Sequence, residues 1–234
     1  MSEVLRGNLK QVQDRIAEVA IQAGRDPAEI TLVAVSKTQP VEALIAAYEL
    51  GVRHFGENRV EEAAGKIAAF RAAIADRAVV FHMIGHVQSR KAEEVAALFD
   101  RVHSVDSAKL AARLSRLAAR PLPILVEVNV SGEESKYGLA AARREELFGV
   151  IEAIAPLPNL RLDGLMTMAP LVADPELTRP VFRALRELRA ELEARYPGLT
   201  LPQLSMGMTD DYEVAIEEGA TLVRIGRAIF GERL

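Results

Sequence analysis

The feature that most constrains the fold is a regular alternation along the whole chain. Short apolar, β-branched runs are followed by longer segments with helical periodicity. Runs such as residues 123–126 lack polar alternation, which is typical of parallel strands covered by helices on both faces. Eight runs are predicted to be strands: residues 31–36, 52–56, 79–84, 101–105, 124–130, 160–168, 203–206 and 221–225. The pattern predicts an α/β fold.

Five further segments show the spacing of amphipathic helices. They cover residues 3–23, 41–50, 61–75, 107–119 and 175–196. An apolar stripe runs along the last of them through Val181, Leu185, Leu188 and Leu192. We expect Asp174 to cap the start of this helix and Gly24 to end the first one.

The strand and helix pairs fill nearly all of the 234 residues, and no Pro/Gly/Ser-rich linker divides them. The prediction is therefore a single domain over residues 1–234, a (β/α)₈ TIM barrel with an extra N-terminal helix. A doubly wound open sheet is the alternative. In a barrel, functional groups are expected where strands end, at the C-terminal rim.

Composition excludes several classes of function. The chain has no cysteine, which excludes disulfides, thiolate metal sites and cysteine nucleophiles. Its net charge is −4 and its Arg and Glu residues are interspersed, so no basic face for nucleic acid is expected. Residues 1–20 contain no continuous apolar stretch, so neither a signal peptide nor a membrane span is predicted there. We expect a cytoplasmic protein with no membrane partner.

Lys37 directly follows the first predicted strand. Partial desolvation at the mouth of an apolar barrel would lower the pKa of its amine and favour attack on an aldehyde. Lys37 is thus a candidate Schiff-base lysine, against the simpler interpretation of a solvated lysine. After the second strand, Asn58 could bond a ligand at the rim, or Asn58 or Glu57 could merely cap the next helix. His82 and His86 flank Gly85 without a metalloprotease glutamate, so no metal site is predicted.

The last two strands lead into glycine-containing loops. The first loop follows Ser205, and the second contains Gly226 and Arg227. A hydroxyl and backbone N–H groups there would form an anion cradle suited to phosphate. Ordinary turns are the alternative. The span from Gly226 to Gly231 lacks the Lys-Ser/Thr of a P-loop, which excludes nucleoside triphosphate binding by that motif.

Nine separate motifs follow one another along the chain: Val35-Ser36-Lys37-Thr38, Phe55-Gly56-Glu57-Asn58, His82-Met83-Ile84-Gly85, Gln88, Ser135-Lys136-Tyr137-Gly138-Leu139, Gly164-Leu165-Met166-Thr167-Met168, Leu204-Ser205-Met206-Gly207-Met208, Val223-Arg224-Ile225-Gly226 and Ile229-Phe230-Gly231. Together, in this order over residues 5–234, they resemble the pyridoxal phosphate homeostasis proteins. The resemblance implies a barrel like the N-terminal domain of alanine racemase.

The resemblance also implies a role for each site residue. Lys37 would form an internal aldimine with pyridoxal 5′-phosphate (PLP), and Asn58 would lie beside the ring. Arg224 would face the pyridine nitrogen. The phosphate would be held by Ser205, Gly226 and the backbone of Arg227. Many relatives have threonine where this sequence has Arg227, so the role of that side chain is not carried over. Contacts at Arg59 and Glu61 are not carried over either, because tyrosine is frequent at the first position and glutamine at the second.

The expected function is intracellular PLP homeostasis without robust catalysis, in a monomer that delivers PLP to apoenzymes. An arginine opposite the pyridine nitrogen donates a hydrogen bond and keeps that nitrogen unprotonated, which weakens the electron sink. The second base of alanine racemases comes from a further domain, and this chain stops after the eighth strand. One alternative is a weak fold-type III racemase with Lys37 and either Tyr137 or His82 as bases. The other is a cofactor-free Schiff-base aldolase acting on a sugar phosphate.

Overall fold

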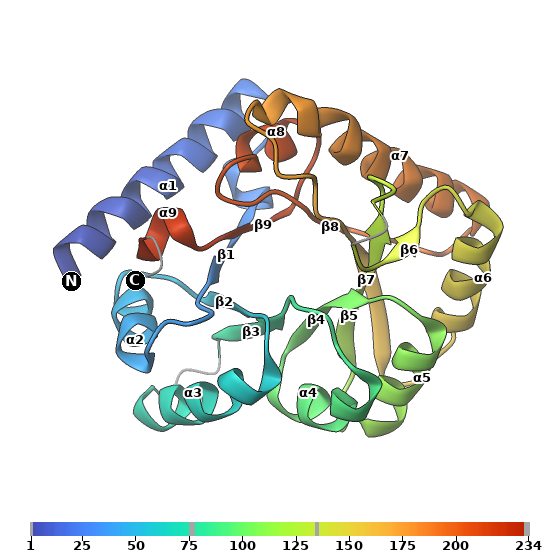
Figure 1. Cartoon of the computed structure of the whole chain (residues 1–234), viewed down its shortest axis with the longest axis horizontal. Coiled ribbons are helices and arrows are strands. Elements are labelled where there is room, and N and C mark those ends of the chain that lie inside the picture. Colours follow the sequence, from blue (N-terminus) through green and yellow to red (C-terminus); the bar gives the residue numbers. More distant parts are fainter. Residues whose placement is uncertain (1, 75–77, 134–135, 232–234) are drawn as a thin grey trace.

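The computed structural model describes residues 2–74, 78–133 and 136–231. Eight parallel strands form a closed ring in the order β4-β3-β2-β1-β9-β8-β7-β5, and β4 pairs with β5 to close it (Figure 1). The eight strands are β1 (Thr31–Val35), β2 (His54–Glu57), β3 (Val80–Met83), β4 (Arg101–Val105), β5 (Leu122–Asn129), β7 (Leu160–Met166), β8 (Gln203–Ser205) and β9 (Leu222–Ile225). This is the predicted TIM barrel, and the open-sheet alternative is wrong.

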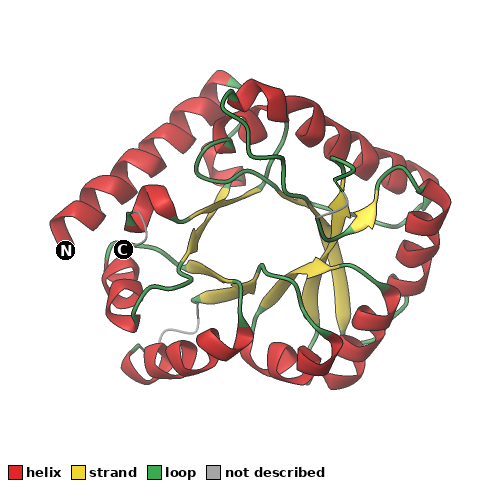
Figure 2. Ribbon diagram, viewed as in Figure 1, coloured by secondary structure: helices red, strands yellow, loops and turns green. Residues whose placement is uncertain are grey.

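Helices surround the ring on the outside (Figure 2). They are α1 (Ser2–Gln22), α2 (Val41–Glu49), α3 (Val60–Ala73), α4 (Ala92–Leu98), α5 (Ala108–Leu117), α6 (Arg144–Ile154), α7 (Arg179–Arg195), α8 (Tyr212–Glu217) and α9 (Arg227–Phe230). Three short 3₁₀ turns are η1 (Pro27–Glu29), η2 (Ser89–Lys91) and η3 (Pro175–Thr178). None of the helices in these described segments is long and apolar enough to cross a membrane.

The predicted elements differ from the structure in a few places. A two-residue strand, β6 (Leu139–Ala140), pairs with β5 beside the ring and was not predicted. Asp174 caps its segment as expected, since its Oδ1 accepts a hydrogen bond from the backbone N of Glu176 at 3.0 Å. The capped turn is the 3₁₀ turn η3, however, and α7 begins only at Arg179. On α7 the buried stripe starts at Phe182 in place of Val181.

The extra N-terminal helix α1 packs across the outside of the barrel beside α8 and α9 (Figure 1). Its buried side chains recur every three or four residues, which turns one apolar stripe toward the barrel. They are Leu5, Leu9, Val12, Ile16 and Val19. The side chain of Asn8 donates a hydrogen bond to the carbonyl oxygen of Ile229 at 3.1 Å. Gly24, with φ +71°, ends the helix as predicted.

An apolar layer fills the middle of the barrel. It consists of Val33, Leu125, Met166 and Leu222 from four different strands. Side chains two positions further along a strand point to the same side, so Glu127 and Arg224 lie inside the barrel, one layer closer to the C-terminal rim. On the side formed by β1, β5, β7 and β9, the interior therefore changes from apolar to charged as it approaches the rim.

Candidate functional site

Lys37 lies in the turn that follows β1, at the C-terminal rim, and is half-buried. β1 pairs with β9 so that Ala34 is the partner of Ile225. Just beyond this pair, a Cβ atom on Gly226 would lie 3.0 Å from the carbonyl oxygen of Val35. The chain that leads to Lys37 and the loop that starts at Gly226 are therefore neighbours.

A buried polar cluster holds the turn around Lys37. The Glu57 Oε1 accepts hydrogen bonds from Ser36 Oγ at 2.7 Å and from Lys66 Nζ at 2.9 Å. Lys66 also donates to the carbonyl oxygen of Ser36 at 2.8 Å and to Glu62 at 3.0 Å. Glu62 in turn accepts the backbone N–H of Thr38, a non-glycine residue with φ +66°. Both flanks of Lys37 are thus tied to the second strand and third helix.

Burial raises the pKa of Glu57, and the bonds from Ser36 and Lys66 oppose that shift. The second oxygen, Oε2, is buried and has no hydrogen-bond partner among the described residues. The Lys66 ammonium lies next to this carboxyl and offsets part of the cost of burying it. The Glu57 carboxyl is therefore buried between β2 and α3, where it accepts a hydrogen bond from Ser36.

Asn58 is half-buried just after β2. A Cβ atom on Gly85 would overlap the carbonyl oxygen of Asn58, so a glycine is required where the two rim loops touch. The N-terminal capping position of α3 is Arg59, which makes no side-chain cap bond. The alternative prediction, that Asn58 or Glu57 caps α3, is therefore wrong.

The guanidinium of Arg224 is buried between two hydrogen-bond acceptors. It donates from Nη1 to Ser205 Oγ at 2.6 Å and from Nη2 to the carbonyl oxygen of Thr167 at 2.9 Å. Burial lowers the pKa of Arg224 to about 10, while Asp211 and Glu127 favour its charged form. The structure thus brings Ser205 and Arg224 into direct contact and turns the Ser205 hydroxyl into the barrel.

The loops after β8 and β9 are joined by an ion pair. The Arg227 guanidinium contacts both carboxylate oxygens of Asp210. In the first loop, Gly207 has φ +90°, and a Cβ atom there would lie 2.6 Å from the Cβ of Ala215. In the second, Gly226 precedes the short helix α9, whose first backbone N–H groups have no intrahelical acceptor. The Arg227 side chain therefore links the loops, and its backbone remains suited to an anion.

Comparison with known proteins decides the family. The family described as "Alanine racemase, N-terminal domain" matches residues 7–234. A pyridoxal phosphate homeostasis protein of Pseudomonas aeruginosa is 47% identical, covering 97% of this chain and 94% of the relative. The chain belongs to the pyridoxal phosphate homeostasis protein family.

Solved structures agree with this assignment. A protein from Bifidobacterium adolescentis is 37% identical with a TM-score of 0.90, covering 98% of this chain and 95% of that one. PipY of Synechococcus elongatus, solved with PLP bound, is 37% identical with a TM-score of 0.80, covering 92% of this chain and 100% of PipY. Most of this chain therefore shares its fold with a 37% identical protein whose structure contains PLP.

His82 and Tyr137 are the two residues that the racemase alternative offers as a second base. His82 lies on β3 inside the barrel and is fully buried. Tyr137 is exposed and stacks on the ring of His86, with the centroids 4.0 Å apart. Within residues 2–74, 78–133 and 136–231, no group of three acidic, histidine or cysteine side chains could hold a metal ion.

Sequence reasoning missed several residues of this homeostasis-family site. Glu57 and Lys66 support the Lys37 turn, Glu127 lies in the interior near Arg224, and His103 contacts Ser205. Glu127 and His103 are polar residues at inward-facing strand positions, whereas Glu57 faces outward from β2 toward Lys66 on the helix behind it. The pairing between strands, which brings them together, cannot be deduced from one strand at a time.

Proposed function

We propose that this protein binds PLP at the C-terminal rim of its barrel, holds it reversibly through a Schiff base to Lys37, and takes part in PLP homeostasis by storing and delivering it. Relatives at up to 47% identity over nearly the whole chain are named pyridoxal phosphate homeostasis proteins. The 37% identical PipY was solved with PLP bound.

The observation that carries the proposal is the pairing of β1 with β9 at the rim. It puts the amine-bearing turn of Lys37 beside the backbone of Gly226 and Arg227. An amine condenses with an aldehyde to form a carbon–nitrogen double bond with loss of one water. Backbone N–H groups at the start of α9 would donate hydrogen bonds to the phosphate oxygens. PLP carries both an aldehyde and a phosphate, so the chemistry of the two neighbouring groups fits it.

The environment of Arg224 favours a protein that binds PLP over one that catalyses a reaction with it. It is buried below the rim with two of its five N–H groups engaged by Ser205 and Thr167, and its remaining donors suit a ring nitrogen. An arginine stays charged even with its pKa lowered to about 10, so it donates to a ring nitrogen and does not protonate it. When bound, PLP supplies an electron sink, and an unprotonated ring weakens that sink.

The roles of Ser205 and Asn58 follow from their places in the structure. The resemblance implies that Ser205 holds the phosphate. Its hydroxyl contacts Arg224 and His103, so we propose instead that it supports Arg224 and reaches the cofactor indirectly. Asn58, half-buried at the end of β2, would lie beside the ring. Arg227 would contribute its backbone, because its side chain is paired with Asp210.

Absorbance and mass analysis test the proposal. Mixing the protein with PLP should give a band at about 420 nm that borohydride removes, leaving a reduced adduct on Lys37. Lys37→Ala should abolish the band and the adduct, whereas Lys109→Ala, an exposed lysine on α5, should leave both unchanged. A protein that stays colourless with PLP would contradict the proposal and favour the aldolase alternative or an unrelated function. Equal labelling of many lysines would contradict the proposal as well.

Loss of deuterium from α-deuterated alanine or serine separates a holder from a racemase. With the PLP-loaded protein we expect exchange no faster than with free PLP. Exchange far above that level, abolished by Lys37→Ala, would show that the protein is an enzyme.

A further inference from the structure

A line of polar side chains crosses the inside of the barrel and is not used by the proposed function. His54 Nδ1 lies 3.0 Å from His82 Nε2, and His82 Nδ1 lies 2.8 Å from His103 Nε2. His103 Nδ1 lies 2.8 Å from Ser205 Oγ, which also contacts Arg224. We call His54, His82, His103 and Ser205 the histidine chain. It joins strands β2, β3, β4 and β8 to the guanidinium on β9.

Burial favours the neutral form of the two middle histidines. His82 and His103 are fully buried, and burial lowers the pKa of each well below its usual value. The neighbouring charges, Arg101 for both and Arg224 for His103, lower the pKa values further. A neutral imidazole donates from one ring nitrogen and accepts at the other. Each imidazole in the histidine chain must therefore accept a hydrogen bond from one neighbour and donate a hydrogen bond to the other.

The Ser205 hydroxyl sets that direction. Its oxygen accepts a hydrogen bond from Arg224, which has only donors, and its single proton must go to another acceptor. That acceptor is His103 Nδ1. His103 then donates from Nε2 to His82 Nδ1, and His82 donates from Nε2 to His54 Nδ1. In the opposite order, two donors would face the Ser205 oxygen while its proton had no acceptor in the described contacts.

The other end of the histidine chain reaches solvent. His54 is half-buried and lines a groove of about 400 Å³ between α1 and the first residues of β1 and β2. Its remaining N–H can be satisfied there by water, which would give every group in the histidine chain a partner. When every hydrogen bond in the histidine chain is made, the chain has one stable arrangement of donors and acceptors. This favours a fixed orientation of the Arg224 guanidinium, which contacts Ser205.

We propose that His103 and His82 are positioning residues for Arg224: through Ser205 they hold the guanidinium in the orientation in which it meets the cofactor ring. The importance of that orientation for PLP rests on the proposed function. The histidine chain itself is present in the protein without PLP. The hydrogen bonds of His82 and His103 run to His54, to each other and to Ser205, so their effect on PLP would be transmitted through Ser205.

The direction of the hydrogen bonds is measurable without PLP. The protein has four histidines, so ¹⁵N-labelled histidine signals can be assigned by single substitutions. These include His86→Gln, which changes the one histidine that does not belong to the histidine chain. We expect His82 and His103 to be neutral and protonated at Nε2 from about pH 6 to pH 8. Protonation of His103 at Nδ1, or a charged His82 in this range, would overturn the proposal.

Ser205 variants test the link to Arg224. Ser205→Ala should shift the His103 signals and speed solvent exchange of the Arg224 side-chain N–H groups, and Ser205→Thr should restore both. Ser115→Ala removes another buried hydroxyl, which donates to the carbonyl oxygen of Pro158, and should change neither. Unchanged Arg224 exchange in Ser205→Ala would overturn the positioning role.

PLP affinity provides the last readout. Ser205→Ala should raise the PLP dissociation constant roughly tenfold, with Ser205→Thr close to wild type and Ser115→Ala unchanged. If Ser205→Ala shifted the histidine signals but changed the PLP dissociation constant by less than twofold, the positioning role would be overturned. The hydrogen bonds of the histidine chain would still stand. A wild-type protein that does not bind PLP would count against the proposed function alone, since Arg224 exchange would still decide the positioning role.

Discussion

At the scale of single residues, the carboxyl of Glu127 is placed where ionisation is costly. It lies on β5, two positions beyond the apolar Leu125, and is almost fully buried. Burial and the charge of Asp106 raise its pKa to about 7, and attraction to Arg224 offsets only part of that shift. The folded protein therefore favours the protonated carboxylic acid up to about neutral pH.

This raised pKa predicts a pH-dependent stability. Because the folded pKa lies above the ordinary value of 4.5, Glu127 destabilises the fold increasingly as pH rises from about 4.5 to about 7, and the cost is constant above that. Glu127→Gln should therefore raise the free energy of unfolding by about 3 kcal/mol at pH 8 and by little at pH 4. Urea unfolding of the PLP-free protein at several pH values measures the difference.

Glu145→Gln is the matched control, because this glutamate on α6 is largely exposed. We expect it to change stability by less than about 0.5 kcal/mol at either pH. A Glu127→Gln variant less stable than wild type at pH 8 would show that attraction to Arg224 outweighs the cost of burial.

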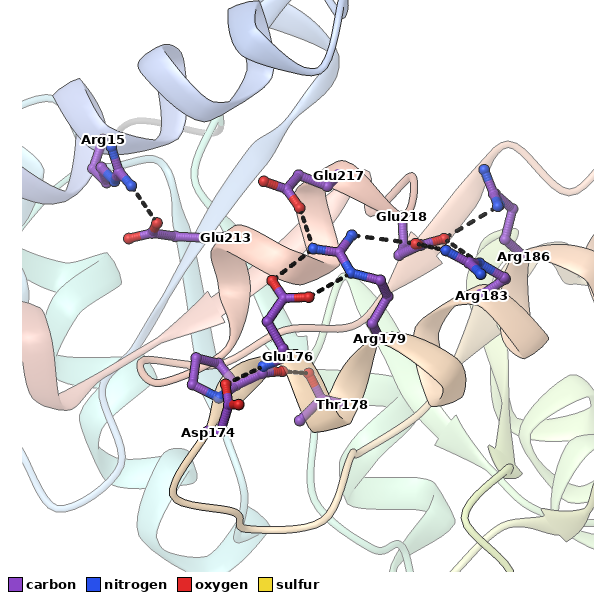
Figure 3. A network of polar contacts seen from close by, with 11 residues as sticks. Arg15, Asp174, Glu176, Thr178, Arg179, Arg183, Arg186, Glu213, Glu217 and Glu218 are labelled. Carbon is purple, nitrogen blue, oxygen red and sulfur yellow. Dashed lines mark hydrogen bonds and ion pairs between the residues drawn. The ribbon is translucent and has the colours of Figure 1, made fainter.

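At the scale of elements, an ion-pair network fixes α8 to α7 (Figure 3). The carboxylate of Glu218, at the end of α8, is 5% exposed and lies 2.8 Å from Arg183, 3.1 Å from Arg186 and 3.3 Å from Arg179. Burial alone would raise the pKa of Glu218, but the hydrogen bonds from Arg183 and Arg179 outweigh it and the net shift is downward. The loop between β8 and α8, which contains Gly207, is thereby anchored from outside the barrel.

Glu218→Gln should destabilise the protein by about 1–3 kcal/mol at pH 7, because three guanidinium groups lose their shared carboxylate. The lowered pKa means that this stabilisation is present above about pH 4.5 and is lost as pH falls further. Thermal unfolding at pH 7 and pH 3.5 checks both parts. Glu217→Gln, which removes a 37% exposed partner of Arg179, should cost less than about 1 kcal/mol, and equal losses in the two variants would refute the network's role.

The elements themselves were largely predictable from the sequence. Strands such as β5 are recognisable because burial on both faces leaves a continuous apolar run. β6 was missed because two residues give no periodic pattern, and its existence depends on pairing with β5. The start of α7 was misplaced because Asp174 caps a 3₁₀ turn, and a capping residue does not show which kind of helix follows.

The site was predictable only in part. Lys37 and Asn58 are predictable because topology places residues that follow parallel strands at one rim, whereas Arg224 is indicated only by the family resemblance. Their roles toward PLP stay predictions. The contacts of Ser205 were not predictable, because its partner His103 is 102 residues away on a different strand. The cluster around Glu57 requires knowing that Lys66, on the outer helix α3, reaches back to the end of β1.

At the scale of the whole molecule, the barrel and α1 share one core. The ring closes through β4 and β5 in the middle of the chain, so no cut along the sequence separates two independent sheets. α1 joins the same apolar cluster as α7, and Arg15 of α1 pairs with Glu213 of α8 at 2.6 Å (Figure 3). We therefore propose that residues 1–234 unfold as one cooperative domain.

Two distant core substitutions test this unity. Leu9→Ala on α1 and Leu185→Ala on α7 each remove a buried leucine side chain and should each cost about 2–5 kcal/mol. In both variants one transition should shift as a whole, with circular dichroism and the fluorescence of the four tyrosines giving the same midpoint. Leu171→Ala, at an 88% exposed position, should shift neither probe. If Leu9→Ala instead produced an early, separate loss of helix while the remaining transition kept its wild-type midpoint, α1 would be an independent attachment, and the barrel alone would be the folding unit.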